Sequence, residues 1–246
     1  MLDISAEKHV ERQTRELVRK KDEFIAIASH ELKTPLTSIK GIIQILERSA
    51  SKGEIEKLKE LTGKAAVQVD KFNILVDQLL DSTNIQAGEL KLKKTHFSLL
   101  ELVQTCTQHA IDQREDVHIE VSGSADIMVY ADRNRLEQVL INLINNAVKY
   151  SPDSHLVQIR VLEQDGIASV HVTDFGIGVE KRKVPLIFDR FYRVDEQNVN
   201  YPGLGLGLFI AAEIIRRHKG EIGVDSESGK GSTFWFSLPV KDNIDD

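Results

Sequence analysis

The chain has 246 residues, of which 41% are hydrophobic and 28% are charged. This composition is typical of a folded protein of one or two domains and excludes the low-hydrophobicity pattern of a disordered chain. The 32 Lys and Arg against 38 Asp and Glu give a net charge of −6, which excludes the overall positive field on which binding to nucleic acid depends.

The first third of the chain has the pattern of a helical hairpin. Residues 5–86 contain one proline, and their apolar residues recur at helical spacing. The first seam, with alternate spacings of three and four residues, consists of Ile25, Ala28, Leu32, Pro35, Ile39, Ile42 and Leu46. After a break at 49–53, the second consists of Leu58, Thr62, Ala65, Val69, Phe72, Val76, Leu79 and Thr83. One hairpin cannot bury two such faces, so we expect a homodimer that closes a four-helix bundle.

From about residue 95 onward, helical patterns alternate with short β-rich runs, which predicts an α/β or α+β domain. Helices are predicted from Ser98 to about Asp112, from Asp132 to about Tyr150, and from about Leu206 to His218. Strands are predicted at 117–121, 127–130, 157–162, 168–173, 221–224 and 233–238.

The single cysteine, Cys106, excludes an internal disulfide and a multi-cysteine metal site, and we interpret it as a small buried hydrophobic residue. No run approaches the roughly 18 apolar residues that cross a bilayer, and the charged N-terminal stretch lacks the apolar core of a signal peptide. We therefore expect a cytoplasmic chain without a membrane segment, which can be the cytoplasmic part of a longer membrane-bound protein.

His30 lies on the side of the first helix opposite its apolar seam. At about 100° per residue, its imidazole points roughly 175° away from the seam and faces solvent. Glu31 adjoins it, and Thr34 lies one turn later on the same side. A neutral imidazole has one nucleophilic nitrogen, and a carboxylate near its N–H can fix the tautomer and accept the proton. These groups suit phosphoryl transfer, and an incidental surface histidine is the alternative.

Three polar residues, Asn142, Asn146 and Lys149, follow one flank of the helix predicted in the middle of the second region. Asparagine oxygens suit Mg²⁺ and a lysine offsets phosphate charge, although a solvated helix edge gives the same pattern. Glycine-rich segments follow at Asp174–Gly178, after a strand, and at Gly203–Gly207, before a helix. They permit close approach of the backbone to a phosphate, and a tight turn and a flexible loop are the alternatives.

Two other classes of nucleotide-binding enzyme are excluded, one by the order of its motifs and the other by a missing motif. Asp-Phe-Gly at 174–176 also occurs in eukaryotic-type protein kinases, where it follows a glycine loop and His-Arg-Asp. Here the glycine-rich loop comes last and the other motifs are missing from the sequence. The sequence also lacks G-x-x-x-x-G-K-[ST], which excludes a P-loop enzyme.

Residues 24–40, which read Phe-Ile-Ala-Ile-Ala-Ser-His-Glu-Leu-Lys-Thr-Pro-Leu-Thr-Ser-Ile-Lys, closely resemble the phosphoacceptor box of bacterial two-component sensor histidine kinases. The resemblance implies that His30 is the phosphorylated residue and that Glu31 accepts the proton. It also implies that Thr34 positions water when the kinase acts in reverse as a phosphatase.

The later segments resemble, in order and spacing, the ATP-binding domain shared by histidine kinases, gyrase, ninety-kilodalton heat-shock chaperones and MutL. This resemblance implies a GHKL (Bergerat) α+β sandwich that uses ATP and Mg²⁺. Residues 142–151 look like its N box, which implies that Asn146 binds Mg²⁺ with support from Asn142. By the same resemblance, Lys149 contacts phosphate and Tyr150 packs on adenine.

The remaining boxes of that domain are also present. Asp174 would accept the adenine amino hydrogen, Arg193 in the F box at 188–193 would contact the γ-phosphate, and Thr233 would complete the adenine pocket. Residues 179–202 would form the lid over ATP. The glycines of the two boxes are Gly176, Gly178, Gly203, Gly205 and Gly207.

The implied function is ATP-dependent autophosphorylation of His30, followed by transfer to an aspartate of a response-regulator receiver domain. We divide the chain into a signalling helix at 1–22, a dimerisation and phosphotransfer hairpin at 23–87, a hinge or linker at 88–94, an ATP-binding domain at 95–241 and an acidic tail at 242–246. An upstream sensor domain is possible. Alternatives are a non-catalytic scaffold, which intact Asn146 and Asp174 argue against, and a serine or threonine kinase or ATPase of the same superfamily, which lacks such a hairpin.

Overall fold

The computed structural model describes residues 4–112, 117–123, 127–152, 154–193 and 203–240, so the tail predicted at 242–246 lies outside the described residues. The helices are α1 (Ile4–Lys52), α2 (Ile55–Gln86), α3 (Leu99–Asp112), α4 (Arg133–Lys149), the 3-10 helix η1 (Val184–Leu186) and α5 (Gly207–Arg217). The strands are β1 (Thr95–Ser98), β2 (His118–Gly123), β3 (Met128–Ala131), β4 (Leu156–Gln164), β5 (Ile167–Asp174), β6 (Glu221–Glu227) and β7 (Gly231–Pro239). Within the described ranges, no helix combines the length and apolarity that a membrane span needs.

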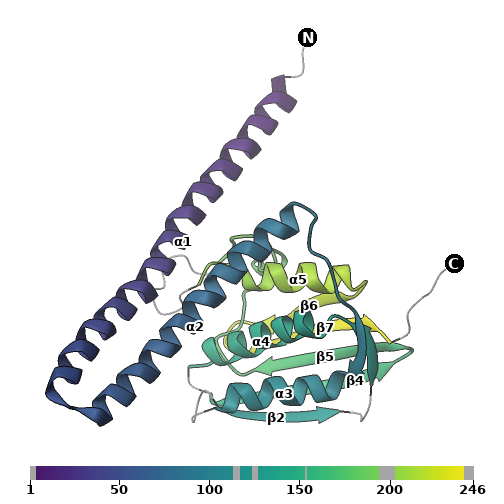
Figure 1. Ribbon diagram of the computed structural model, residues 1–246. Coiled ribbons are helices and arrows are strands. Elements are labelled where there is room, and N and C mark those ends of the chain that lie inside the picture. Colours follow the sequence, from purple (N-terminus) through teal and green to yellow (C-terminus); the bar gives the residue numbers. More distant parts are fainter. Residues whose placement is uncertain (1–3, 113–116, 124–126, 153, 194–202, 241–246) are drawn as a thin grey trace. The chain divides into compact units, whose positions relative to one another are not determined.

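The described residues divide into two compact units. The first comprises those up to Asp81 together with Gly203 and Leu204, and the second comprises the rest. The first unit is the predicted helical hairpin, in which a turn at Gly53, with φ of +71°, joins α1 to α2 (Figure 1). Ala28 and Pro35 of the predicted α1 seam are buried, and α1 continues through Pro35 without interruption.

On α2 the buried face is rotated slightly from the predicted seam. Leu61 is buried, whereas Thr62 and Val69, both assigned to the seam, are exposed. The hydroxyl of Thr62 instead bonds to the helix's own carbonyl groups, those of Leu58 and Lys59. These hydrogen bonds satisfy the hydroxyl within its own helix, so Thr62 can lie beside apolar residues.

The second unit is a layer of helices α3, α4 and α5 against a five-stranded sheet of order β2-β4-β5-β7-β6 (Figure 1). β2 and β4 are parallel, and the other neighbours are antiparallel. Apolar side chains that alternate along the strands, such as Val170 and Phe236, are buried against the helices. The intervening residues, such as Arg160 and Trp235, are half-buried or exposed on the other face. This confirms an α+β sandwich.

The six predicted strands are present, and the structure adds β1, which pairs with β3 in a separate two-stranded sheet. The prediction missed β1 because its four residues, Thr95–Ser98, include one apolar residue, Phe97, whereas the equally short β3 is apolar throughout. The predicted cap of α3 is confirmed, since Ser98 Oγ accepts the Glu101 N–H at 3.2 Å. Cys106 on α3 is 2% exposed, and burial raises the pKa of its thiol to about 12, which confirms its assignment to the core.

Asp132 caps α4 as predicted and also connects it to the end of α5. Its Oδ1 accepts the Arg135 N–H at 3.2 Å, and its backbone N–H donates to His218 Nε2 at 2.9 Å. His218 Nδ1 therefore carries the proton that it shares with the Ile214 carbonyl at 2.8 Å. Burial lowers the pKa of His218, so the neutral imidazole holds the two helix ends together.

Candidate functional site

His30 lies on α1 with its side chain 80% exposed, as the helical geometry predicts. Its Nδ1 is 3.9 Å from Oε1 of Glu31, whose side chain is only 19% exposed. That separation is longer than a hydrogen bond, but it places the carboxylate on the Nδ1 side of the ring. Thr34 Oγ1 donates to the His30 carbonyl at 3.0 Å. The three residues therefore lie together, with Nε2 as the ring nitrogen turned away from the carboxylate.

Asp174 ends β5 with a side chain that is 3% exposed. Its Oδ1 accepts the N–H groups of Gly176 at 3.0 Å and Ser232 at 3.2 Å and the hydroxyl of Ser151 at 3.5 Å. Burial raises the pKa of this carboxyl group, and these hydrogen bonds oppose the rise. All three bonds end on Oδ1, so a ligand that reaches this carboxylate would meet Oδ2.

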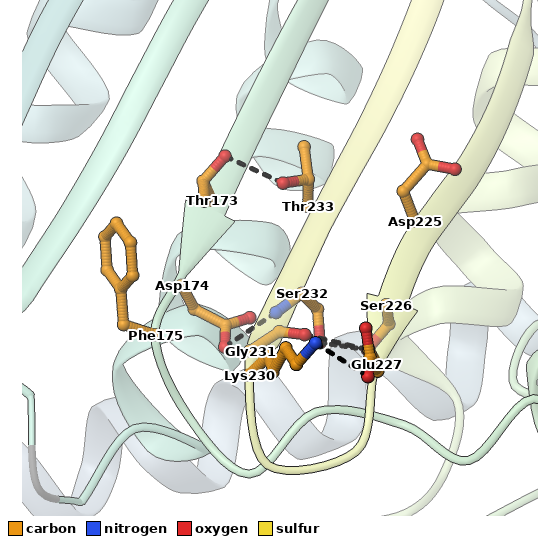
Figure 2. A pocket seen from close by; sticks show the side chains of 10 residues that line it. All are labelled: Thr173, Asp174, Phe175, Asp225, Ser226, Glu227, Lys230, Gly231, Ser232 and Thr233. Atoms are coloured by element: carbon orange, nitrogen blue, oxygen red, sulfur yellow. Dashed lines mark hydrogen bonds and ion pairs between the residues drawn. The ribbon is translucent and has the colours of Figure 1, made fainter.

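A pocket of about 450 Å³ opens where β5 ends beside the β6–β7 hairpin (Figure 2). Lys230 Nζ and Glu227 Oε1 form an ion pair at 2.9 Å on its rim, and the ring of Phe175 is exposed. The lining residues are Thr173, Asp174, Phe175, Asp225, Ser226, Glu227, Lys230, Gly231, Ser232 and Thr233. This part of the sheet therefore combines hydroxyl groups, carboxylates and one aromatic ring.

Thr233 and Asp174 both line this pocket, although the strand register places the Thr233 side chain on the opposite face of the sheet from the Asp174 side chain. The strand register pairs Thr233 with Thr173, and their hydroxyl groups are 2.9 Å apart (Figure 2). Asp174 is paired with Ser232 instead. Because successive side chains of a strand point to opposite faces, Ser232 and not Thr233 shares the face of the carboxylate.

The glycines at 176 and 178 allow the loop after Asp174 to pack tightly. A Cβ on Gly176 would lie 2.0 Å from the Tyr150 carbonyl oxygen, which also accepts the Ile177 N–H at 3.0 Å. Gly178 has φ of +65°, and a Cβ there would lie 2.1 Å from the Glu227 carbonyl oxygen. The loop is therefore held between the end of α4 and the β6–β7 hairpin.

α4 carries the other polar residues of this site. Lys149 Nζ lies 4.9 Å from the centre of the Tyr150 ring, and Asn146 is half-buried one turn after Asn142. Among the residues that the structure describes, the buried Nδ2 of Asn142 has no hydrogen-bond partner. A Cβ on Gly207 would lie 2.1 Å from Asn142 Oδ1, so this asparagine faces the first turn of α5. An unpartnered donor beside a helix N-terminus fits a bound phosphate.

The F-box turn brings Arg193 to the second glycine segment. Phe191 donates its N–H to the Gly205 carbonyl at 3.2 Å, and a Cβ on Gly205 would lie 3.3 Å from Arg193 Cγ. Gly205 has φ of +66°, and Gly203 has φ of +148°. The lid was predicted at residues 179–202, and its part at 194–202 lies outside the described residues.

Sequence reasoning missed the two serines that hold Asp174. Ser151 was noted as the last residue of the N box, but its hydroxyl reaches Asp174 only because α4 ends beside β5. Ser232 could have been found, because strand alternation after Gly231 separates it from Thr233.

Two family models match the chain. HATPase_c, the histidine kinase-, DNA gyrase B-, and HSP90-like ATPase, matches residues 131–242. HisKA, the His Kinase A (phospho-acceptor) domain, matches residues 20–88. The two matches fall on the two parts of the chain that carry Asp174 and His30.

The relatives are sensor kinases. The chain is 34% identical over 251 residues to the autoinducer 2 sensor kinase/phosphatase LuxQ of Vibrio vulnificus (strain YJ016), covering 97% of this chain and 29% of LuxQ. It is 31% identical over 252 residues to the sensor histidine kinase WalK of Bacillus subtilis (strain 168), covering 99% of this chain and 39% of WalK. It thus spans only a part of these relatives. The crystal structure of full-length ShkA in complex with AMPPNP matches with a TM-score of 0.63 and 25% identity, over 89% of this chain and 45% of ShkA. The chain therefore belongs to the sensor histidine kinases, and it carries their phospho-acceptor and ATPase domains.

Proposed function

We propose that this chain transfers the γ-phosphoryl group of ATP to His30 and then passes it to an aspartate of a response regulator. The observation that carries the proposal is the exposed imidazole of His30 beside the Glu31 carboxylate, in a chain that also has an ATPase domain. This carboxylate lies beside Nδ1 and is mostly shielded from solvent, an arrangement that an incidental surface histidine does not require.

The chemistry follows from the two ring nitrogens. Nε2 attacks the γ-phosphorus, the bond from phosphorus to the bridging oxygen of ADP breaks, and ADP leaves. Proton loss from Nδ1 keeps the phosphorylated ring neutral, and Glu31 Oε1, 3.9 Å away, is the acceptor. A shortening of this distance by about 1 Å would make a hydrogen bond.

The nucleotide would be held by residues from several segments. Asp174 Oδ2 would accept the adenine amino hydrogen, with Ser232 in the role expected of Thr233. Tyr150 would pack on the base. Asn142 Nδ2 fits a phosphate oxygen because it is buried and unpartnered among the described residues.

The triphosphate end would use cations. Lys149 and Arg193 would neutralise phosphate charge, and the glycines from Gly203 to Gly207 would allow the backbone to approach it. Asn146 would supply an oxygen ligand to Mg²⁺, and the ion would offset negative charge on the triphosphate.

We also propose a homodimer. Large apolar side chains remain exposed along both helices of the hairpin, namely Ile25, Leu36, Ile43, Ile45, Ile55, Val67, Val69, Ile74 and Leu80. Apolar faces of this extent are typical of interfaces, and a second hairpin would cover them in a four-helix bundle. The response regulator would then dock near His30 on the outside of the bundle.

Reverse phosphatase activity is proposed for the same surface. The exposed Thr34 hydroxyl lies one turn from His30, where it can orient a water molecule toward a phosphoaspartate. LuxQ is described as a sensor kinase/phosphatase.

The test is labelling of the whole chain with γ-³²P-ATP and a measurement of acid lability, because phosphohistidine is lost in acid and phosphoserine is kept. We expect His30→Ala to abolish the label while its affinity for a fluorescent ATP analogue stays within about twofold of the unaltered chain. His109→Ala on α3, at an exposed position of the other unit, is the matched control. Acid-labile label on the His30→Ala chain would refute the assignment.

A further inference from the structure

The linker after α2 is fixed to the second unit by contacts to its backbone. Arg217 Nη1 donates to the Leu90 carbonyl at 2.7 Å, and the Lys93 N–H donates to Asp132 Oδ2 at 2.7 Å. The side chain of Leu90 is buried. Arg217 Nη1 also donates to the Gly88 carbonyl at 3.5 Å. These contacts hold the linker predicted at 88–94 at Gly88, Leu90 and Lys93.

The last turn of α2, which belongs to this second unit, is held differently, by the side chain of Arg190. Arg190 Nε donates to Ser82 Oγ at 3.0 Å, and Nη1 donates to Gln86 Oε1 at 2.9 Å. Ser82 and Gln86 are four residues apart and so share one face of the helix. A planar guanidinium can bond to both at once only while that turn stays helical and keeps its rotation.

Arg190 is directly followed by a residue with an unusual backbone. Phe191 has φ of +68°, a left-handed conformation that an aromatic residue rarely adopts. Its N–H donates to the Gly205 carbonyl at 3.2 Å, and its ring lies 4.4 Å beneath the Arg190 guanidinium. Such a conformation persists only where the surroundings hold it. The contact with α2 and the contact with Gly205 are therefore adjacent links in one chain of interactions.

We propose that Arg190 is a positioning residue that senses the last turn of α2 and thereby sets the nucleotide affinity of the loop around Arg193 and Gly205. The inference rests on the proposed function, because it takes this loop to bind phosphate. While the Arg190 guanidinium donates to Ser82 and Gln86, the F-box turn is preorganised for nucleotide binding. When that turn of α2 rotates or unwinds, both acceptors leave, the turn relaxes and nucleotide binds less tightly.

The coupling must act in both directions. If the conformation of the last turn of α2 changes the affinity for nucleotide, nucleotide binding must change the stability of that turn by the same free energy. Nucleotide binding should therefore protect the amides of the last turn of α2 from hydrogen exchange. Hydrogen exchange gives a readout that does not depend on catalysis, and a merely structural role of Arg190 would not produce it.

The experiment measures the Kd for a fluorescent ATP analogue on the full chain. We expect Arg190→Ala to weaken binding about tenfold, since hydrogen bonds to a charged group are among the stronger ones. Arg190→Lys, which replaces the fork by a single ammonium group, should lie in between. Gln86→Glu should tighten binding about twofold, because it adds a charge opposite the guanidinium. Arg160→Ala, which removes an exposed arginine of β4 outside the segments assigned to the nucleotide, is the matched control and should change nothing.

A double-mutant cycle gives the sharpest outcome. Ser82→Ala should weaken binding in the unaltered chain and have no further effect in the Arg190→Ala chain, because both remove the same interaction. Two results would overturn this inference and leave the proposed function standing. One is additive effects of Ser82→Ala and Arg190→Ala on the Kd. The other is an unchanged Kd for Arg190→Ala when the unaltered chain binds nucleotide normally. The inference would also be overturned if nucleotide binds to the chain but does not protect the amides of the last turn of α2 from hydrogen exchange. Failure of the unaltered chain to bind nucleotide would overturn the proposed function and this inference together.

Discussion

Replacement of Asp174 by asparagine should separate the stability of the ATP-binding unit from its affinity for adenine. The two N–H groups and the hydroxyl that bond to the side chain all end on Oδ1, at 3.0, 3.2 and 3.5 Å. An asparagine carbonyl in the same rotamer can accept all three. The amide then places an NH₂ group where the adenine amino group needs an acceptor.

The expected magnitudes differ for the two properties. Burial raises the pKa of Asp174, so removal of the charge relieves a desolvation cost, while the three hydrogen bonds each lose their charge assistance. These effects oppose each other, and we expect the free energy of unfolding to change by less than about 1 kcal/mol. Binding loses a charge-assisted hydrogen bond of about 1.5–3 kcal/mol and gains two opposed donors, so the Kd for ATP should rise by roughly 10- to 100-fold or more.

Two measurements on the full chain check this prediction. Chemical denaturation gives the free energy of unfolding, and competition against a fluorescent ATP analogue gives the Kd for ATP and for GTP. Because the new amide can donate to the O6 of guanine, the ratio of the ATP and GTP affinities should shift toward GTP. A Kd for ATP equal to that of the parent chain, with the fold intact, would refute the placement of adenine at Asp174.

Three further predictions concern the other sites. Thr34→Ala should leave autophosphorylation of His30 near the parent rate and slow dephosphorylation of the cognate regulator by about tenfold or more, as measured by both assays on one preparation. The free energy of unfolding should fall as the pH drops below 6.5, the ordinary pKa of histidine, because burial lowers the pKa of His218 and the unfolded chain takes up a proton that the folded chain does not. The contribution of His218 should approach about 1.4 kcal/mol per pH unit between its two pKa values, and it should be lost in His218→Gln, which leaves the contribution of His171, whose pKa burial also lowers. Gly176→Ala should abolish nucleotide binding, because its Cβ would lie 2.0 Å from a backbone oxygen.

A specific result would contradict each of these three predictions. Equal loss of both activities in Thr34→Ala would assign the hydroxyl to the helix backbone, to which it already donates. An unchanged pH slope in His218→Gln would place the titration elsewhere. For Gly176 the control is Gly63→Ala on α2, where a Cβ has no atom within 4 Å and should slightly stabilise the helix. Equal binding by both alanine variants would show that the loop can shift without cost.

Periodicity and capping patterns were sufficient to predict the hairpin, the three α-helices of the second unit and six of the seven strands. They failed where a residue's role depends on a partner far away in sequence. Ser232 and not Thr233 shares the face of Asp174, because the strand pairing decides which hydroxyl lies on that face, and that register joins segments 58 residues apart. Motif spacing locates a box to within a residue, whereas the strand register decides the face.

The contacts of Arg190 and His218 could not be predicted for the same reason. Arg190 is an ordinary arginine of the F box until α2 places Ser82 beside it, 108 positions earlier in the chain. A cation at the end of a helix is favourable, yet burial lowers the pKa of His218 at the end of α5, and its ring nitrogens bond to two helices. Local helix rules describe an isolated helix, whereas packing here favours the neutral imidazole.

The burial of Cys106 has a practical consequence for experiments on conformational change. With its pKa at about 12 instead of the ordinary 9.0, its thiolate fraction at neutral pH is about a thousandfold smaller than that of an exposed cysteine, and access to reagents is restricted as well. Because it is the only cysteine in the sequence, a second cysteine introduced at an exposed position such as Ser29 or Lys181 should react selectively with a maleimide dye. Pairs of dyes for distance measurements between the phospho-acceptor hairpin and the ATPase domain could thus be attached without altering the native core.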